Sequence, residues 1–295
     1  MKKFIILIPL FNDWKSVGKL LQEIDSQTKN WDSDVSVIII NDASTEEKSS
    51  LEKKYNKIKS VKILNMKKNQ VHQRCIATGL MYVSQNEDFD YVIVMDADGE
   101  DRPEELNDFL KKSHENPNKT ITGNRFKRSE GIIFRVLYEI HKLLTLLFAG
   151  KLIKFGNFTC LPKDHVKELI KKSYLWNSYS SSVVKTINDR TFIPSIRGVR
   201  YVLPSKMNFS ALVYHSLTII SVFKKTVIIR SVAFLLVYLF LISSNFSVVT
   251  MIPVLLLVFF VLIIFKISLR ANLDELNKSL ENIGSIEVLG SSDRR

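Results

Sequence analysis

Tyr91–Glu100 reads YVIVMDADGE, in which an apolar run ends directly at acidic residues in alternate positions, Asp96, Asp98 and Glu100. Unbroken apolar runs of this length are typical of strands that are buried on both faces of a parallel sheet. Carboxylates at this spacing can share a divalent cation, Mg²⁺ or Mn²⁺, whose remaining ligands are phosphate oxygens. The alternative, an acidic loop that only caps a helix beginning at Pro103, stays open because acidic residues suit a helix N-terminus.

The sequence on both sides repeats this pattern of apolar runs separated by residues with helical spacing. It therefore predicts an α/β fold with a mostly parallel sheet and helices on both faces. Ligands of such sheets bind beyond the carboxyl ends of the strands, which is where the polar residues of this sequence gather. The apolar runs are 4–10, 35–40, 61–64, 91–95 and 120–122, and the polar clusters are Asn12-Asp13, Asn41-Asp42, Asn65 with Asn69, and Asp96 with Asp98.

The composition excludes several classes of protein. The 295 residues are 46% hydrophobic and 24% charged, with a mean hydropathy of +0.05, which excludes a disordered chain and a polytopic transporter. Two cysteines, Cys75 and Cys160, are too few for a disulfide framework. The sequence has neither a glycine-rich phosphate loop nor a G-x-S-x-G motif, which removes the main support for dehydrogenases, P-loop enzymes and serine hydrolases. The net charge of +12 indicates an anionic partner: nucleic acid, a phosphate-bearing substrate or a membrane surface.

Residues 231–265 contain no Asp, Glu, Lys, Arg or His. This run is about twice as long as one helix needs to cross a hydrocarbon core of about 30 Å. A polar turn, 243–247, divides it, so we predict two transmembrane helices at about 227–243 and 248–265. Arg230, near the start of the first helix, is expected to extend to the membrane interface. The alternative is a buried helical hairpin in a soluble core.

Basic residues flank the charge-free run on both sides, and such residues stay on the cytoplasmic side of a membrane. We therefore expect a multi-pass protein of the inner (cytoplasmic) membrane whose first domain faces the cytoplasm. The flanking residues are Lys224, Lys225, Arg230, Lys266 and Arg270.

A second basic region, 111–154, contains apolar residues on one helical face over about 131–149. This pattern predicts an amphipathic helix at the membrane interface, with a helix packed on the core as the alternative. Membrane contact accounts for the charge and no basic–aromatic motif occurs, so nucleic acid is disfavoured as a partner. The predicted organisation is a cytoplasmic catalytic domain 1–205, an interfacial segment 206–226, two transmembrane helices within 227–265, and a cytoplasmic tail 266–295.

Several segments together resemble family 2 glycosyltransferases of the GT-A fold. Ile8–Asp13 (IPLFND) is similar to their P-x-Y-N-E segment, Asn41–Ser44 (NDAS) to D-D-G-S, and Asp96–Asp98 to D-x-D. Asn69–Gln73 (NQVHQ) and Asp96–Glu104 more narrowly resemble the polyprenyl-phosphate glycosyltransferases, relatives of dolichyl-phosphate mannose synthase. The resemblance extends over about residues 4–265 and implies a GT-A catalytic domain followed by a two-span hairpin.

The resemblance also implies roles for individual residues. Asp96, Asp98, Arg125 and Arg128 would be central to catalysis. This chain differs from the family pattern at Glu100, where glutamine is usual, and at Val71 and Gly99, where glycine and leucine are common. The implied nucleotide site is Pro9, Phe11, Asp13, Asp42, Asn69 and Asp96; the metal site is Asp98 and Glu100 with Asp96; and the acceptor phosphate site is Arg125, Arg128, Arg200 and Lys206.

The implied reaction is the inverting transfer of a sugar from a nucleotide-diphosphate sugar, with UDP favoured, to a polyprenyl phosphate. In a bacterium the acceptor would be undecaprenyl phosphate, and the product would serve cell-envelope glycan or lipopolysaccharide modification. A phosphate monoester carries about −1.5 to −2 charges at neutral pH, so no strong catalytic base is required. Two alternatives stay open: a family 2 enzyme that glycosylates a hydroxyl of a lipid-linked or growing glycan, and a catalytically silent membrane scaffold. Assembly as a homo-oligomer also stays open.

Overall fold

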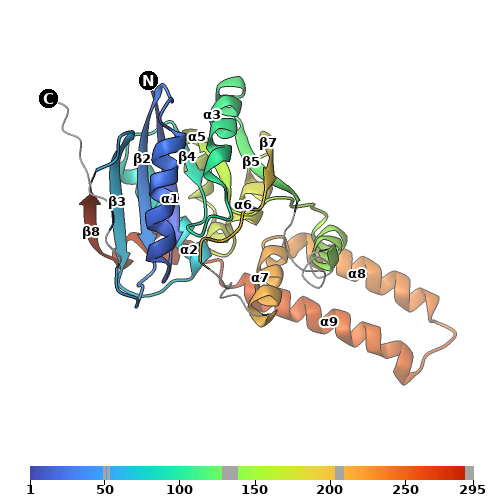
Figure 1. Ribbon diagram of the computed structural model, residues 1–295. Helices are drawn as coiled ribbons and strands as arrows, with labels where there is room; N and C mark the ends of the chain where they lie inside the picture. The colour runs from blue at the N-terminus through green and yellow to red at the C-terminus, as the bar shows by residue number, and fades with distance from the viewer. Residues whose placement is uncertain (49–50, 52–53, 128–138, 203–208, 290–295) are drawn as a thin grey trace. The chain divides into compact units, whose positions relative to one another are not determined.

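The computed structural model describes residues 1–48, 51, 54–127, 139–202 and 209–289. The chain divides into two compact units (Figure 1). The first, here called the α/β unit, contains 1–129, 154–205 and 273–295, and the second, the helical unit, contains 130–153 and 206–272.

An eight-stranded sheet in the order β7-β5-β6-β4-β1-β2-β3-β8 forms the centre of the α/β unit. The four strands β4, β1, β2 and β3 run parallel, as do β5 and β7, whereas β6 and β8 are antiparallel to their neighbours. The mostly parallel sheet predicted from the sequence is thus confirmed. The strands are β1 Lys2–Leu10, β2 Ser33–Asn41, β3 Ile58–Met66, β4 Tyr91–Val94, β5 Thr120–Lys127, β6 Thr159–Pro162, β7 Arg190–Ile196 and β8 Ile283–Leu289.

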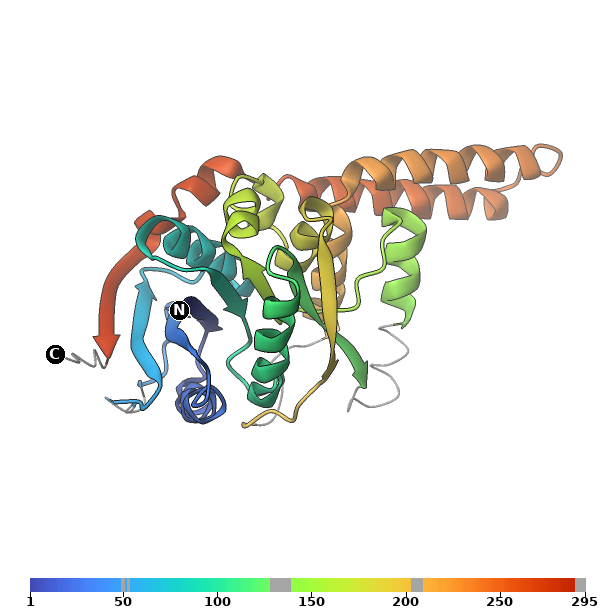
Figure 2. The same cartoon turned by 90° about the horizontal axis from the view of Figure 1, so that it is seen from above.

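Helices cover both faces of this sheet (Figure 2). Helices α1 and α3 pack on the face that carries Phe4, Ile6 and Ile8, whereas α2, α5, α6 and α10 pack on the face that carries Ile5 and Leu7. Because both faces are buried, β1 is apolar at successive positions, as expected for a central parallel strand. The helices of this unit are α1 Trp14–Gln27, α2 His72–Asn86, η1 Pro103–Glu105, α3 Leu106–Glu115, α5 Lys163–Leu169, η3 Ser173–Trp176, α6 Tyr179–Thr186, α10 Leu273–Asn277 and η4 Ser279–Asn282.

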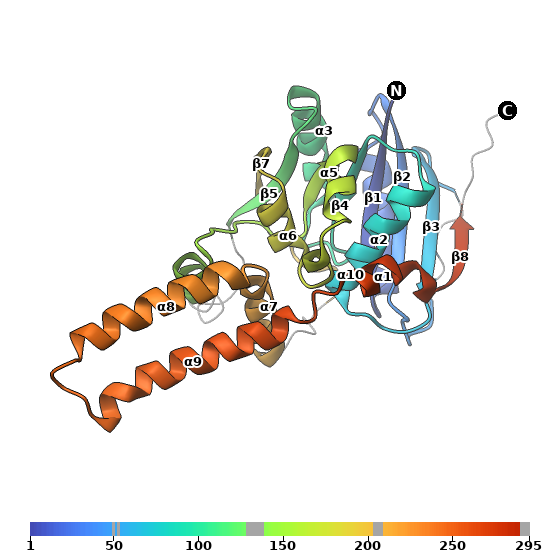
Figure 3. The same ribbon diagram turned by 180° about the vertical axis from the view of Figure 1, so that it is seen from behind.

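The C-terminal segment returns to the sheet. Within the predicted cytoplasmic tail, 266–295, the sequence predicts a helix over 269–283, and the structure has α10 and η4 there; strand β8 was not predicted. Strand β8 pairs antiparallel with β3, where Ile286 lies opposite Leu64 (Figure 3). Leu276 of α10 is fully buried in the core that α2 covers. The pairing supplies hydrogen-bond partners to β3, which would otherwise be an open edge.

Helices α8 and α9 of the helical unit lie side by side and are joined by a short loop (Figure 1). Within the described residues, one helical stretch, Val248–Asn277, is long and apolar enough to span a membrane, with a mean hydropathy of 3.2 in its most apolar part. Helix α8 has a similar length but carries three cationic side chains near its start, Lys224, Lys225 and Arg230. Of the two predicted spans, the second is thus supported by its length and composition, and the first stays a prediction. The helices of this unit are η2 Thr145–Ala149, α7 Phe209–Ser221, α8 Lys224–Leu241 and α9 Val248–Ser268.

The segment that ends in η2 packs within the same unit. Residues 139–149 are helical, whereas 131–138 of the predicted interfacial helix lie outside the described residues. Phe148 contacts the rings of Phe234 and Phe260. Arg230 donates hydrogen bonds to the carbonyl oxygens of Leu146 and Leu147, at 2.9 Å each, so its guanidinium caps this helix end. Its predicted place at a membrane interface stays a prediction.

Candidate active site

The loop that follows β4 carries four carboxylates close together, and arginines of the α/β unit neutralise most of them. Arg200 Nη1 lies 3.0 Å from Asp98 Oδ2 and 3.7 Å from Glu100 Oε1. Arg197 Nη2 lies 2.5 Å from Glu100 Oε2. Asp98 and Glu100 therefore both face the guanidinium of Arg200. The backbone N–H of Glu100 also donates to Asp98 Oδ1 at 2.9 Å, which fixes the turn between them.

Asp96 is held by two side chains from other parts of the chain. His72, the first residue of α2, places Nε2 3.1 Å from Asp96 Oδ1. Asn157, just before β6, donates from Nδ2 to the same oxygen at 3.0 Å and lies 2.9 Å from His72 Nε2. Gln73 accepts a hydrogen bond from the backbone N–H of Tyr179 and donates to Asn157 Oδ1 at 3.4 Å, which ties α2 and α6 to the same cluster.

Asp101 connects this loop to β5. Its carboxylate accepts a hydrogen bond from the backbone N–H of Asp96 at 3.0 Å and pairs with Arg125 Nη2 at 3.2 Å. The Asp101 side chain is 1% exposed and that of Arg125 12% exposed. Arg125, predicted to bind the acceptor phosphate, thus has a structural contact to the acidic loop.

The crowding of carboxylates shifts their pKa values in different directions. Desolvation and the charges of Asp96 and Glu100 raise the pKa of Asp98 to about 6, against the opposing effect of Arg200. Desolvation and Asp96 likewise raise the pKa of Asp101 to about 7, against Arg125. For Asp96, desolvation is outweighed by His72, Asn157 and Arg125, so its pKa is lowered.

The pKa of His72 moves with that of Asp96. Desolvation would lower it, but the neighbouring carboxylate of Asp96, aided by Asp98 and Asp101, outweighs that effect and raises the pKa of His72. The 3.1 Å contact between His72 Nε2 and Asp96 Oδ1 accounts for these opposite shifts.

The donor set suits a divalent cation. No group of three or more His, Cys, Asp or Glu side chains arranged to hold a metal occurs among the described residues. However, Asp98 and Glu100 already face one cationic nitrogen, and Mg²⁺ is commonly bound by one or two carboxylates together with substrate phosphates. The residues therefore fit a metal whose coordination is completed by a diphosphate.

The loops after β1 and β2 join beside this cluster. Asn12 has a positive φ of 52° and accepts hydrogen bonds from the backbone N–H groups of Thr45 and Glu46. Asp42 is 2% exposed, and its carboxylate accepts hydrogen bonds from the backbone N–H groups of Gln70 at 2.6 Å and Val71 at 2.9 Å. Asp42 thus fixes the backbone of the two residues that precede α2, the helix that begins at His72.

The remaining predicted nucleotide residues lie in the same loops. Phe11 is 46% exposed and Asp13 directly precedes α1, whereas Pro9 is buried within β1. Asn69 donates from its side chain to the carbonyl oxygen of Asp42 at 3.1 Å. Their binding to a nucleotide stays a prediction, as do the roles assigned to Asp42 and Asp96.

The structure gathers Asp96, Asp98, Glu100, Arg125 and Arg200 in one region. Arg128 and Lys206 lie outside the described residues. Three residues that contact the cluster were not predicted from the sequence: Asn157, Arg197 and Asp101. Arg197 could have been predicted, because it is a cationic residue three positions before Arg200. Nothing in the sequence around Asn157 indicated a contact with the carboxylates.

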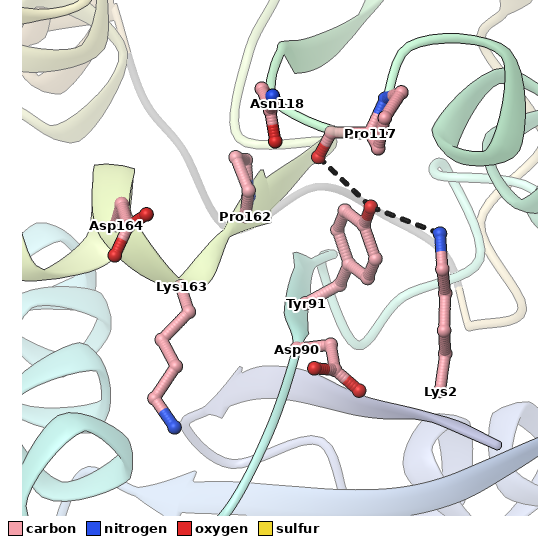
Figure 4. Close-up of a pocket in the computed structure, with 8 residues that line it drawn as sticks. All are labelled: Lys2, Asp90, Tyr91, Pro117, Asn118, Pro162, Lys163 and Asp164. Carbon is pink, nitrogen blue, oxygen red and sulfur yellow. Dashed lines mark hydrogen bonds between the residues drawn. The ribbon is translucent and has the colours of Figure 1, made fainter.

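A surface hollow of about 220 Å³ lies elsewhere, at the amino ends of β1 and β4 (Figure 4). Lys2 donates to the Tyr91 hydroxyl at 3.3 Å, and that hydroxyl donates to the carbonyl oxygen of Pro117 at 2.9 Å. Since ligands of parallel sheets bind at the carboxyl ends of strands, this hollow is not the candidate active site.

The sequence model of glycosyl transferase family 2 matches residues 5–175, more than half of the chain. The chain belongs to glycosyl transferase family 2. It is thus a glycosyltransferase that uses a nucleotide sugar, as predicted from the sequence. No curated protein matches the chain.

Solved structures share the fold at low sequence identity. Mannosyl-3-phosphoglycerate synthase from Rubrobacter xylanophilus is 13% identical, with a TM-score of 0.55 over 78% of this chain and 74% of that one. Glucosyl-3-phosphoglycerate synthase from Mycobacterium tuberculosis, in complex with Mn²⁺, UDP-glucose and phosphoglyceric acid, is 11% identical, with a TM-score of 0.51 over 78% and 79%. The same enzyme with Mg²⁺ and UDP is 12% identical, with a TM-score of 0.51 over the same shares. These similarities establish the α/β fold of a GT-A-like domain.

Proposed function

We propose that this glycosyltransferase is anchored in the inner membrane and transfers a sugar, with inversion, from a UDP-sugar to a polyprenyl phosphate. The observation that carries the proposal is the combination of a family 2 domain with the helical stretch Val248–Asn277. This stretch is long enough to cross a membrane, and only 6% of its most apolar part is buried within the protein. Such exposure of apolar surface is expected where lipid replaces water as solvent. An enzyme held at the bilayer is well placed for an acceptor that is itself a lipid.

The connectivity supports an even number of membrane crossings. The segments before Lys206 and after Asn272 belong to the same α/β unit, and β8 pairs in its sheet. A chain that crosses a membrane once between those points would place the two parts of one domain on opposite sides. Two spans formed by α8 and α9 avoid this, and Arg230 of α8 has hydrogen-bond acceptors in the carbonyl oxygens of Leu146 and Leu147.

In the proposed reaction an oxygen of the acceptor phosphate attacks the anomeric carbon of the donor sugar. The bond between that carbon and the β-phosphate oxygen breaks, and the oxygen leaves with the electron pair on the nucleoside diphosphate. The acceptor is already anionic, so positioning and charge neutralisation are the main tasks of the protein. Asp98 and Glu100 would hold Mg²⁺ or Mn²⁺, the ions found with UDP in the related structures, and the ion would neutralise charge on the diphosphate. Arg200, with Arg125, Arg128 and Lys206, would neutralise the acceptor phosphate.

The test compares acceptors of two kinds. Membranes containing the protein are incubated with labelled UDP- and GDP-sugars and either undecaprenyl phosphate or 3-phosphoglycerate, the acceptor type named for the related structures. The proposal expects label in the organic phase with undecaprenyl phosphate. Label only in a water-soluble product would instead favour the phosphoglycerate reaction, and label in neither would leave the hydroxyl acceptor of a lipid-linked glycan or the silent scaffold.

The membrane topology is tested separately by cysteine labelling. The two native cysteines, Cys75 and Cys160, are buried, so single added cysteines report cleanly. Asn245→Cys, between α8 and α9, is expected to react with a membrane-impermeant maleimide in intact cells after outer-membrane permeabilisation. Lys278→Cys, directly after the end of α10, is expected to react only after the inner membrane is opened. Equal labelling of both positions would contradict the two-span arrangement.

A further inference from the structure

Residues 197–201, here called the strap, lie across the loop that carries the carboxylates. The backbone N–H of Gly198 donates to the carbonyl oxygen of Glu100, and that of Tyr201 donates to the carbonyl oxygen of Asp98, both at 2.9 Å. These bonds hold the strap on the loop by its backbone, independently of the side chains.

The contact between strap and loop depends on glycine and on an aromatic ring. Gly99 has a φ of +85°, and a Cβ at this position would lie 2.7 Å from the ring of Tyr201. A side chain at Gly99 would therefore displace Tyr201, whose hydroxyl in turn bonds to the carboxylate of Glu23 in α1. Gly99 and Tyr201 form a matched pair that seats the strap.

Arg200 of the strap is only partly satisfied. Its Nη1 faces Asp98 and Glu100, at 3.0 and 3.7 Å. Its Nε is buried and has no hydrogen-bond partner among the residues that the structure describes. A buried guanidinium N–H without an acceptor is costly, so this side of the group favours an additional anion.

The position of Arg200 Nη1 is also unfavourable for a metal ion bound to the same two carboxylates. Asp98 and Glu100 are the carboxylates that would hold the divalent cation, and a guanidinium already neutralises them. Two cations that approach the same pair of carboxylates repel each other, and they must therefore compete. Binding of a metal with the diphosphate would displace Arg200 from Asp98.

We propose that Arg200 exchanges partners during the reaction cycle: it neutralises Asp98 and Glu100 before the donor binds, and is released by the metal–nucleotide complex to bind the acceptor phosphate. The inference rests on the proposed function for the identity of that phosphate. It predicts an order of binding in which the donor precedes the acceptor, because Arg200 becomes available only after the metal has taken its carboxylates.

The first experiment measures Mn²⁺ binding without nucleotide, by electron paramagnetic resonance of free Mn²⁺, on the purified full-length protein in detergent. Arg200→Gln is expected to bind Mn²⁺ about fivefold tighter or more than the wild type, the lower end of typical coupling between two competing ligands. Arg200→Lys keeps the charge and is expected to lie between them, and it also serves if the glutamine variant fails to fold. The matched control is Arg102→Gln, which removes a nearby charge that pairs with Glu104 and retains the Cγ beside Gly198. Unchanged Mn²⁺ affinity in both Arg200 variants overturns the inference, as does an equal gain in Arg102→Gln.

The second experiment measures binding of farnesyl phosphate, a short isoprenyl phosphate, with and without Mn²⁺ and UDP. The wild type is expected to bind it at least about fivefold tighter when both are present, and Arg200→Gln is expected to lose this difference. Equal binding by the wild type in the two conditions overturns the exchange. Farnesol, which lacks the phosphate, is the control for the lipid tail. Failure of the proposed function would appear elsewhere, as absence of sugar transfer to undecaprenyl phosphate despite a normal Mn²⁺ response in Arg200→Gln.

Discussion

The side-chain amide nitrogen of Asn157 lies 3.0 Å from Asp96 Oδ1 and 2.9 Å from Nε2 of His72. A residue that precedes β6 thus bridges the first carboxylate of the D-x-D segment and the first residue of α2. Because the sheet brings the ends of β4 and β6 together as antiparallel neighbours, this contact depends on the fold and not on sequence proximity.

We expect Asn157→Ala to lower kcat/KM for sugar transfer by roughly 10- to 100-fold, the range typical of groups that orient metal-site ligands. The variant frees Asp96 and His72 from a shared partner while leaving the strands intact. Asn118→Ala, at an exposed position of the remote hollow, is the control and should retain activity. An Asn157→Ala enzyme with wild-type kcat/KM would show that the bridge has no catalytic consequence.

Asp98→Ala should reduce metal-dependent transfer by roughly 100-fold or more, a loss comparable to removal of a main electrostatic contact of the transition state. The carboxylate is one of two that converge on Arg200, so its removal leaves Glu100 alone to hold the metal. Labelled lipid product is measured at saturating Mn²⁺, and recovery in the membrane fraction shows whether insertion is unaffected. Asp108→Ala, exposed on α3, should behave as the wild type. Wild-type product formation by Asp98→Ala would remove the metal assignment.

The sequence predicted the four central parallel strands because each is an apolar run buried on both faces. It did not predict β6, β7 or β8. Strand β6 has four residues and ends at Pro162, and β7 contains Pro194 and alternates between exposed and buried positions. Strand β8 joins β3 from more than 200 residues away, and such non-local pairing leaves no local pattern.

The residues of the candidate site were likewise predictable only where they follow a strand with a local sequence pattern. Asp96, Asp98 and Glu100 follow a strand whose direction is readable, so their common location was predictable. The partners Asn157 and Arg197 come from irregular segments, and only the packing of the α/β unit brings them to the carboxylates. The sequence therefore predicted the charged groups of the site better than the contacts that orient them.

Removal of β8 should destabilise the α/β unit. A chain that ends at Asn282 exposes the edge of β3, and an open edge favours aggregation as well as unfolding. We expect its melting temperature to fall by about 4 °C or more, which corresponds to roughly 1–2 kcal/mol for a domain of this size. Glu287→Gln removes the ion pair with Lys48 but keeps the pairing, so it should change stability little. Equal melting temperatures for the full and shortened chains would contradict a structural role for β8.

Arg230→Met should loosen residues 139–149 within the helical unit. The guanidinium donates to the carbonyl oxygens of Leu146 and Leu147, and methionine supplies similar length without any donor. Hydrogen exchange in lipid nanodiscs should show faster exchange of amides in 139–149, with α9 unchanged. The control, Lys225→Met, removes an exposed charge from the same helix and should not alter this segment. Identical exchange in both variants would mean that the cap contributes nothing to local order.

His165 should make the α/β unit less stable at acidic pH. Its Nδ1 lies 2.8 Å from Thr120 Oγ1, and burial lowers the pKa of His165 below its usual value near 6.5. The unfolded chain therefore binds more protons than the folded one between the folded pKa and about 6.5, so stability rises with pH across that window. The contribution of His165 to the free energy of unfolding is complete above about pH 6.5, and it is lost as the pH falls towards the pKa of His165 in the folded protein. His165→Gln keeps a polar partner for Thr120 but does not titrate, so the drop in melting temperature from pH 7.5 to 5.5 should be smaller in this variant than in the wild type. Taking the difference between the two proteins at each pH removes the opposite contribution of His72, whose pKa is raised. An equal drop in both proteins would exclude His165 as its source.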